Sequence, residues 1–469
     1  MSKNSFEIPE DWAWTTMGDI ADVVGGGTPK TNDPTNYDDG DIPWITPADL
    51  SGYTSKYIGR GARSITQKGL NSSSARMIPA GSVLFTSRAP VGYVAVATND
   101  VCTNQGFKSF VLKTKNILPD YVYWWLKGNK DLAESYASGT TFLELSGAKA
   151  KQLPIPIAPL EQQTRIVAEI EKQFSRVDEA VANLNRVKAN LKRYKAAVLK
   201  AAVEGKLTEE WRKAHPEVEP ASEVLKRILA ERRTKWNGKG KYKEPNIPRV
   251  SGAFDLPKGW AIACIEQLLP PQREAMKTGP FGSLLKKHEH RAEGVPVLGI
   301  ENIEAMHFLR GSNIHVTSEK AKQLEQYRVK PLDILISRSG TISEICVVPE
   351  DIGEAIFSTN LMKISLVHKA IHPQFFTFLF NGSPFVLNQI SELCKGSTRT
   401  FLNQDILKRL TFVLPPVEEQ HEIIRALERQ FTFIDRLYRQ IETNLHRSEG
   451  LRQAIVRMSF SGALPANQQ

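Results

Sequence analysis

The sequence has few cysteines and no long apolar run. Its four cysteines lie far apart, so their spacing predicts neither a zinc site nor a disulfide framework; we expect all of them to be reduced and buried: Cys102, Cys264, Cys346 and Cys394. His288-x-His290 has no acidic or cysteine partner nearby, which is typical of a solvated loop rather than a metal site. No stretch of about eighteen apolar residues occurs, and Met1 to Trp14 lacks the layout of a signal peptide. These absences predict a cytoplasmic protein.

Catalytic motifs are also missing. There is no G-x-x-x-x-G-K-[ST] loop and no Asn-Pro-Pro-Tyr or Asp-Pro-Pro-Tyr segment, so neither an ATP motor nor an amino-methylating site is indicated. Gly25-Gly26-Gly27 lacks the later glycine of a dinucleotide site and is as well explained by a tight turn near a phosphate backbone. Glu204-Gly205-Lys206 has no acidic partner strand. The sequence therefore predicts a chain without a catalytic site of its own.

The chain does carry a basic excess. Its 469 residues suggest two to four domains at roughly 150 residues each. The hydrophobic share of 41% is ordinary for a globular protein, whereas the net charge of +10 favours a polyanionic partner such as DNA, RNA or an anionic membrane surface. A basic protein without such a partner remains the alternative at this point.

A long internal repeat organises the chain. Residues 153–163, LPIPIAPLEQQ, return as residues 410–420, LTFVLPPVEEQ, which is 257 positions later (410 less 153). The same offset continues without a gap to Gly205, which matches Gly462. Upstream the match is weaker and the offset drifts, as in Val83–Arg88 with Ile334–Arg338 and Thr103-Asn104 with Thr359-Asn360. We therefore predict the order variable domain, constant segment, variable domain, constant segment.

The constant segments predict long helices. Ile170, Val177, Leu184, Leu191 and Val198 recur every seven residues, the stripe of a coiled coil, and Ser448 interrupts the equivalent stripe in the second copy. Prolines place the helix starts near Leu160 and Val417, and Gly205 and Gly462 are plausible stops. Such a helix needs a partner to bury its stripe, and its own repeat folded back antiparallel is the simplest one. Packing of each helix on its own domain alone is the alternative.

The variable halves read as mixed α/β domains. Residues 82–86, 93–97 and 333–337 have strand character, and residues 121–127 and 373–380 look helical. A lysine-rich linker with a short helix at 222–236 joins the halves. We predict a first domain at 1–155, a helix at 156–207, the linker at 208–253, a second domain at 254–412 and a second helix at 413–464.

Both halves carry a matching set of motifs. In the first half these are Gly26-Gly27-Thr28-Pro29, Thr86 to Gly92, Asn104 to Phe107 and Ser138 to Thr141. In the second they are Gly279 to Ser283, Ile336 to Gly340, Ser358 to Leu361 and Lys395 to Thr398. With the proline-rich stretch and Glu-x-Gln that close each half, the chain resembles, over essentially its whole length, the specificity subunit of type I restriction-modification systems. Ser343 departs from the family's usual glycine.

The resemblance implies a non-catalytic DNA reader. It implies two target-recognition domains, each reading one part of a split DNA sequence, separated by an antiparallel two-helix coiled coil. It also implies that two modification subunits with S-adenosylmethionine and two restriction subunits with ATP and Mg²⁺ supply the chemistry, so that this chain itself binds no cofactor. The halves differ in sequence, which predicts an asymmetric target.

Candidate DNA-contacting residues follow from base and phosphate chemistry, since arginine suits guanine, amides suit adenine and lysine suits phosphate. We treat Arg88 with Arg338, Asn104 with Asn360 and Lys108 with Lys363 as equivalent pairs. The full predicted set is Thr28, Lys30, Thr86, Ser87, Arg88, Asn104, Gln105, Lys108, Thr140 and Thr141 in the first half, and Ser283, Ser337, Arg338, Asn360, Lys363, Ser397, Thr398 and Arg399 in the second.

Two other functions remain open at the sequence level. One is a self-contained DNA methyltransferase or nuclease, against which the missing motifs argue. The other is an assembly protein whose helices join other subunits and which reads no sequence. If the chain does read DNA, the helical pair would set the spacing between half-sites, and one helical repeat inserted within residues 180–197 would lengthen that spacing.

Overall fold

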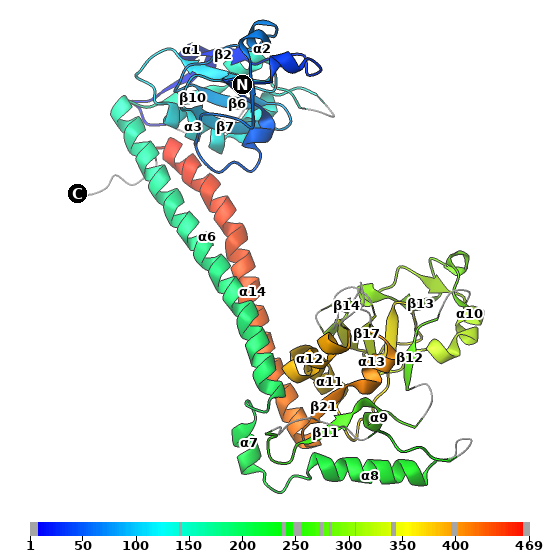
Figure 1. Ribbon diagram of the computed structural model, residues 1–469. Coiled ribbons are helices and arrows are strands. Elements are labelled where there is room, and N and C mark those ends of the chain that lie inside the picture. Colours follow the sequence, from blue (N-terminus) through cyan, green and yellow to red (C-terminus); the bar gives the residue numbers. More distant parts are fainter. Residues whose placement is uncertain are drawn as a thin grey trace. The chain divides into compact units, whose positions relative to one another are not determined.

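The chain forms two compact units (Figure 1). The computed structural model describes residues 8–139, 143–236, 241–246, 255–271, 275–280, 284–304, 306–338, 344–394 and 402–462. Unit 1 comprises Met1–Arg186 with Ile441–Gln469, and unit 2 comprises Val187–Gln440. Each unit therefore contains one variable domain and a half of each long helix. The sequence predicted the two long helices as segments separate from the variable domains, and so did not predict that each helix is divided between the two units.

Unit 1 is built on two sheets and a two-stranded ribbon. A five-stranded sheet has the order β2-β9-β6-β7-β4, a three-stranded sheet has the order β5-β3-β8, and β1 pairs with β10. The strands are β1 (Ala13–Thr16), β2 (Ala21–Gly25), β3 (Ile42–Ile45), β4 (Tyr57–Ile58), β5 (Arg63–Ile65), β6 (Val83–Ser87), β7 (Val91–Ala97), β8 (Cys102–Thr103), β9 (Lys108–Leu112) and β10 (Pro154–Ile157). The expected strands at 82–86 and 93–97 are thus confirmed as β6 and β7.

Unit 2 repeats this topology. The orders β12-β20-β17-β18, β16-β13-β19 and β11-β21 match those of unit 1, except that β4 has no counterpart in the four-stranded sheet and that β14 and β15 form an added ribbon. The strands are β11 (Ala261–Cys264), β12 (Met276–Thr278), β13 (Val295–Leu298), β14 (Ile303–Glu304), β15 (His307–Phe308), β16 (His315–Val316), β17 (Ile334–Ser337), β18 (Ile345–Val347), β19 (Ile356–Phe357), β20 (Leu361–Ile364) and β21 (Thr411–Leu414). The predicted duplication of one mixed α/β fold is confirmed.

Short helices cover the sheets. In unit 1 they are α1 (Met17–Ile20), α2 (Gln67–Asn71), α3 (Pro119–Gly128), α4 (Lys130–Tyr136) and α5 (Gly147–Lys151). In unit 2 they are α7 (Glu209–Ala214), α8 (Ala221–Thr234), α9 (Ile265–Leu268), α10 (Ser318–Gln323), α11 (Pro373–Gly382), α12 (Pro384–Leu393) and α13 (Gln404–Arg409). The helices expected at 121–127, 222–236 and 373–380 are present as α3, α8 and α11.

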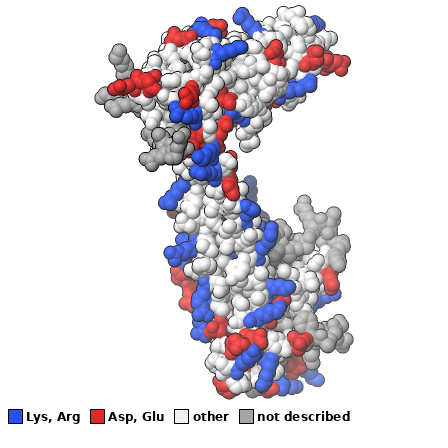
Figure 2. Space-filling view, turned by 90° about the vertical axis from the view of Figure 1, so that its left-hand side faces the viewer, with Lys and Arg blue, Asp and Glu red and all other residues white. Residues whose placement is uncertain are grey.

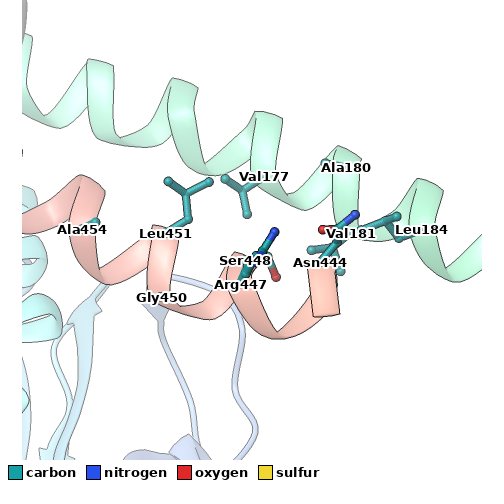
Figure 3. A pocket seen from close by; sticks show the side chains of 10 residues that line it. All are labelled: Val177, Ala180, Val181, Leu184, Asn444, Arg447, Ser448, Gly450, Leu451 and Ala454. Atoms are coloured by element: carbon teal, nitrogen blue, oxygen red, sulfur yellow. The ribbon is translucent and has the colours of Figure 1, made fainter. Parts of the chain in front are cut away.

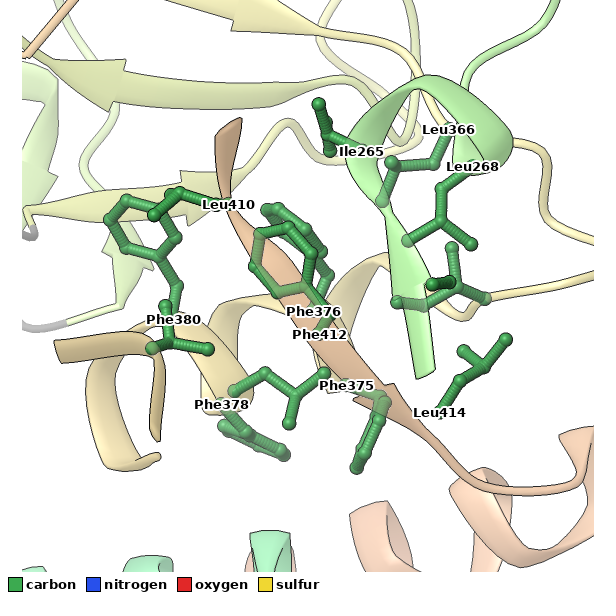
Figure 4. Packing of buried hydrophobic residues seen from close by; sticks show 14 of the residues in the cluster. Ile265, Leu268, Leu366, Phe375, Phe376, Phe378, Phe380, Leu410, Phe412 and Leu414 are labelled. Atoms are coloured by element: carbon green, nitrogen blue, oxygen red, sulfur yellow. The ribbon is translucent and has the colours of Figure 1, made fainter. Parts of the chain in front are cut away.

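The core of unit 2 is rich in phenylalanine (Figure 4). Phe375, Phe376 and Phe380 of α11 are fully buried, and Phe412 of β21 lies 5.0 Å from Phe376 between ring centroids. Apolar residues of α9 close the cluster from the other side of β21. This packing explains why the second variable domain needs α11 against its two-stranded ribbon: burial of each aromatic side chain contributes about 1.5–3 kcal/mol.

The two long helices begin and end where proline and glycine predict. Helix α6 spans Leu160–Val203 and α14 spans Val417–Phe460, and Gly205 and Gly462 beyond them adopt positive φ angles of 74° and 72°. Glycine tolerates this left-handed conformation at a helix end. In each unit, one half of α6 packs against one half of α14.

The helix contacts are antiparallel and repeat in both units. In unit 1, Arg452 pairs with Asp178 and lies 5.3 Å from the Phe174 ring centroid. In unit 2, Lys195 pairs with Asp435 at 3.0 Å and lies 4.8 Å from the Phe431 ring. Each residue of the second set is the repeat equivalent of one in the first. The antiparallel self-packing of the repeat is therefore confirmed, and the alternative of separate packing is wrong.

A shallow groove interrupts the helix pair in unit 1 (Figure 3). Val177 and Leu451 point toward one another across it, whereas Ser448 and Gly450 leave space, and the hollow measures about 530 Å³. The interruption of the apolar stripe predicted at Ser448 thus corresponds to a gap in packing.

The Glu-x-Gln motif is a structural joint at the start of each long helix. The Gln163 side chain is fully buried, accepts from the Leu118 N–H at 3.0 Å and donates to the Asn116 and Ala158 carbonyls. Gln420 makes the same three bonds in unit 2, to His372, Ala370 and Pro415. Each glutamine fastens its long helix to the N-terminal end of α3 or α11.

Helix ends from the opposite half of the sequence complete each domain. In unit 1, Phe460 of α14 is fully buried, 4.8 Å from Tyr121 and 5.1 Å from Trp125 between ring centroids. A Cβ on Gly128 would lie 2.3 Å from Val456 Cγ1, and a Cβ on Gly382 in unit 2 would lie 2.4 Å from Leu199 Cγ. The absence of a side chain at these glycines allows the long helix to approach α3 and α11.

Candidate nucleic-acid interface

A glycine loop follows β2 in unit 1 and crosses two other backbone segments. A Cβ on Gly26 would lie 2.0 Å from the Asn104 carbonyl oxygen, and one on Gly27 would lie 2.2 Å from the Ala75 nitrogen. The Gly27 N–H donates to Thr103 O at 2.9 Å. Only glycine fits at either position, which explains the run Gly25-Gly26-Gly27 as a backbone crossing.

Aromatic and amide side chains hold this loop from beneath. Trp44 Nε1 donates to Gly27 O at 2.9 Å, Tyr37 Oη donates to Pro29 O at 2.7 Å, and Asn36 Nδ2 donates to Lys30 O at 3.1 Å. The loop therefore has a defined shape that leaves Lys30 exposed.

Two of the predicted residues meet across the crossing. The Thr28 hydroxyl donates to the exposed side chain of Gln105. Asn104 is half-buried and its Oδ1 accepts from the Gly106 N–H at 2.9 Å. Thr28, Lys30, Asn104 and Gln105 thus form one cluster, the loop cluster of unit 1.

Arg88 and Lys108 form a second cationic cluster with Glu144. Arg88 Nη1 lies 3.5 Å from Glu144 Oε2, and the two side chains are 38% and 48% exposed. Burial lowers the pKa of Lys108, which Glu144 opposes and Arg88 reinforces. Two cations share one carboxylate here, so the cluster keeps a positive charge at the surface. Glu144 could not be predicted from the sequence, because no motif or spacing distinguishes a single glutamate after the Thr140-Thr141 segment.

Thr86 and Ser87 lie inside the domain. Both are fully buried in β6, and the Thr86 hydroxyl donates to Pro90 O at 2.7 Å and accepts from the Tyr93 N–H at 2.8 Å. Neither side chain has surface for a ligand, so their predicted contact with DNA is replaced by a structural role in the β6–β7 connection.

Unit 2 builds the same crossing from different side chains. A Cβ on Gly279 would lie 1.9 Å from the Ser358 carbonyl oxygen, and the Thr359 hydroxyl donates to Pro280 O at 2.5 Å. Asn360 is exposed beside it. The two units therefore share one loop geometry and present different chemistry on it.

Three other predicted residues of unit 2 are buried. Ser337 is 2% and Arg338 8% exposed, and Arg338 Nη1 donates to Thr359 O at 3.0 Å, while burial lowers the pKa of Arg338. Lys363 is 4% exposed, lies 3.5 Å from Asp333 and donates to Arg328 O at 3.1 Å. These contacts hold the side chains within the domain. For Lys363 the expectation of a phosphate contact is corrected to a buried ion pair.

The strand register also corrects the predicted residue pairs. The Ser87 and Arg338 N–H groups both donate to the loop after β8 or β19, and their carbonyls accept from Leu145 and Leu402, respectively. Arg338 is therefore equivalent to Ser87, and Arg88 is not its counterpart. Letter matching aligned Ser87-Arg88 with Ser337-Arg338, whereas the strand pairings place Val83 with Ile334 and therefore Ser87 with Arg338, one position away.

The other two pairs shift in the same way. The Asn104 and Ser358 N–H groups donate to the equivalent Ile45 and Leu298 carbonyls, so Asn104 corresponds to Ser358 and not to Asn360. In unit 2, Lys363 pairs with Leu335. In unit 1, extending the Val83–Phe110 pair by one residue pairs Leu84 with Ser109, so Lys363 is equivalent to Ser109 and not to Lys108. Because side chains alternate along a strand, such a shift moves Lys363 to the opposite face from Lys108.

The remaining predicted residues lie outside the described part of the chain. They are Thr140, Thr141, Ser283, Ser397, Thr398 and Arg399. Ser343, the departure from the family pattern, also lies outside it.

Among the described residues no group of three histidine, cysteine or acidic side chains could hold a metal ion. All four cysteines are free and buried, as expected, and burial raises the pKa values of Cys102 and Cys346 to about 12. None of the described helices is both long and apolar enough to cross a membrane. Figure 2 shows basic and acidic side chains interspersed on the face it draws, so the positive excess is not gathered into one patch there.

Comparisons with known proteins agree with this architecture. The chain is 39% identical over 442 residues to the type I restriction enzyme MjaIX specificity subunit of Methanocaldococcus jannaschii, covering 90% of this chain and 88% of that protein. The fold matches the crystal structure of the HsdS subunit from Thermoanaerobacter tengcongensis with a TM-score of 0.59 at 17% identity, over 99% and 100% of the two chains. A chain from a structure of a type I R-M system matches with a TM-score of 0.64 at 19% identity, over 98% and 100%.

The family model described as type I restriction modification DNA specificity domain matches residues 9–193 and 277–447, which is most of the chain and falls once on each variable half. The duplicated fold and the duplicated match agree. The chain belongs to the family of type I restriction-modification DNA specificity subunits.

Proposed function

We propose that this chain reads a bipartite, asymmetric DNA sequence, one half-site per unit, and carries no catalytic site. The observation that carries the proposal is the glycine crossing that both units share, with Thr28, Lys30 and Gln105 on it in unit 1 and Thr359 and Asn360 in unit 2. Two domains that share one fold but present different side chains are suited to bind two different short DNA sequences.

The proposed contacts with DNA are of two kinds, those that position the duplex and those that read its bases. Lys30, Arg88 and Lys108 carry charge that suits phosphate, which supplies salt-dependent affinity and fixes register. Gln105 and Asn360 are exposed amides that suit adenine edges in the major groove. The buried residues Thr86, Ser87 and Lys363 hold the strands that present these groups.

The partners follow from the family. We propose that two modification subunits with S-adenosylmethionine and two restriction subunits with ATP and Mg²⁺ join this chain, that the chain itself needs no cofactor, and that the complex works in the cytoplasm, where its DNA lies. The paired halves of α6 and α14 would set the spacing between the half-sites.

Mapping of methylated sites tests the reading. Cells expressing this chain with its modification subunits should methylate one split sequence, whereas a modification complex lacking this chain should not. Methylation without sequence preference would contradict the proposal and favour an assembly role. Methyl transfer by the purified chain alone would instead support the methyltransferase alternative.

The spacing role has a separate test. Seven residues inserted within 180–197 of α6, with a matching insertion within 437–454 of α14, keep the repeat equivalence of the helices. The mapped target should keep both half-sites and gain length between them. A change in the half-site sequences would contradict this role.

A further inference from the structure

Arg63, at the start of β5, is an exposed arginine held against aromatic rings. Its guanidinium carbon lies 4.2 Å from the Tyr37 ring centroid and 5.9 Å from that of Trp44. Tyr37 and Trp44 are the same residues that hold the glycine loop through Pro29 and Gly27. One aromatic pair therefore fixes both the loop cluster and the position of Arg63.

The donors of Arg63 are not taken up by a carboxylate. Among the residues that the structure describes, no acidic side chain lies within ion-pair distance of Arg63, whereas Arg88 lies 3.5 Å from Glu144. Nearby Arg60 donates to Ser64 Oγ at 2.9 Å. A guanidinium stacked on an aromatic ring keeps its in-plane N–H groups free for a planar acceptor.

The strand pairing puts Arg63 at the same end of the three-stranded sheet as the loop cluster. Arg63 stands opposite Trp44 in β3, and Trp44 stands opposite Cys102 in β8. Asn104 and Gln105 follow Cys102 by two and three residues and so lie at the same end of this sheet. Side chains directly opposite one another share a face, so Arg63 lies on the face that Trp44 and Tyr37 cover.

In unit 2 an apolar residue stands at the position equivalent to Arg63. Pro43 stands opposite Ser64 and, in the equivalent pair, Pro296 stands opposite His315. The residue before His315, equivalent to Arg63, is Ile314, which is partly buried against the core. The cation is therefore a property of unit 1, as a residue that reads only one of two half-sites should be.

We propose that Arg63 reads a guanine in the half-site bound by unit 1, donating two hydrogen bonds to O6 and N7. The inference rests on the proposed function. Arginine matches this pair of acceptors better than any other side chain, and a good bidentate contact discriminates against the wrong base by a factor of roughly 5 to 150. A uniform contact with phosphate is the competing outcome.

The experiment uses the complex of this chain with its modification subunits. Arg63→Met keeps the aliphatic stem on Tyr37 and removes the fork, Arg63→Lys keeps the charge, and Arg60→Met is the matched control on the same segment. Affinity is measured at fixed salt for duplexes in which each base pair of the mapped target is replaced in turn.

The expected result is loss of discrimination at one G·C pair of one half-site in Arg63→Met, by roughly 5- to 150-fold, with Arg60→Met unchanged there and with a smaller loss in Arg63→Lys, whose ammonium can still donate to guanine. Retained discrimination in Arg63→Met, or equal weakening of that variant on every duplex, would overturn the inference. Absence of any sequence preference in the unaltered complex would instead overturn the proposed function.

Discussion

At the residue scale, the glycines of the crossing are the most sensitive positions. Gly26→Ala places a methyl group 2.0 Å from the Asn104 carbonyl, where only backbone could move aside. We expect a loss of DNA affinity of at least tenfold and a lower free energy of unfolding, by about 1–3 kcal/mol, as for other overpacked sites. Gel-shift titration and denaturant unfolding measure the two effects.

Gly450→Ala is the matched control. This glycine lies within α14 and a Cβ there would meet nothing within 4 Å. Because alanine favours helix over glycine by about 1 kcal/mol, the control should be slightly stabilising and should leave affinity unchanged. A Gly26→Ala variant that behaved like Gly450→Ala would contradict the crossing.

His372, which caps the start of α11 in unit 2, predicts that the stability of this unit depends on pH. Burial lowers the pKa of His372, and His421 and His368 lower it further. The folded state therefore binds this proton less readily than the unfolded chain, whose histidine titrates near 6.5. The contribution of His372 to the free energy of unfolding is therefore fully present above pH 6.5. It is lost as the pH falls through the lower pKa that His372 has in the folded state.

His372→Asn isolates this effect. Asparagine can replace the Nδ1 acceptor that caps α11 by receiving the Gln374 N–H. Denaturant unfolding should show the free energy of the native chain falling more than that of the variant between pH 7.5 and 5.5. Parallel pH profiles of the native chain and the variant would contradict this role of His372.

At the element scale, the buried pair Lys363 and Asp333 replaces two serines. The equivalent positions in unit 1 are Ser109 and Ser82, on β9 and before β6. Ser365 and Lys330 complete the bonding of Asp333, at 2.5 Å and 2.8 Å. Unit 2 therefore holds a polar core pair where unit 1 holds small hydroxyls.

Removal of one partner should cost much more than removal of both. Lys363→Ser leaves Asp333 charged in a buried site and should destabilise unit 2 by about 3–5 kcal/mol. Adding Asp333→Ser recreates the unit 1 pair and should recover a large part of the loss. A double mutant less stable than Lys363→Ser alone, in chemical unfolding, would contradict this interpretation.

Sequence reasoning succeeded where local chemistry decides the element. Proline and glycine located both ends of α6 and α14, and the heptad stripe predicted their antiparallel pairing. It failed where register decides, because the letters Ser-Arg lie one position apart in β6 and β17 and so hid the equivalence of Arg338 with Ser87. Arg63 escaped notice because its role depends on Tyr37 and Trp44, which only folding brings beside it.

At the scale of the whole molecule, each unit depends on a helix end from the other half of the sequence. Phe460→Ala should destabilise unit 1 by about 3–5 kcal/mol, because the ring is fully buried among Tyr121 and Trp125. Met458→Ala, at a side chain 51% exposed, is the control and should change little. Hydrogen exchange should report the loss in α3 and not in α11; equal loss in both would contradict the division into units.

This sharing also sets an order of events during synthesis. Phe460 follows Gly128 by 332 positions, so a ribosome adding about 5–20 residues per second makes α3 roughly 15–70 s before the residue that covers it. Unit 2 spans Val187–Gln440, so all of its residues are made before Phe460. The half translated later can therefore mature first, whereas the amino-terminal half completes its packing only once Phe460 has been made.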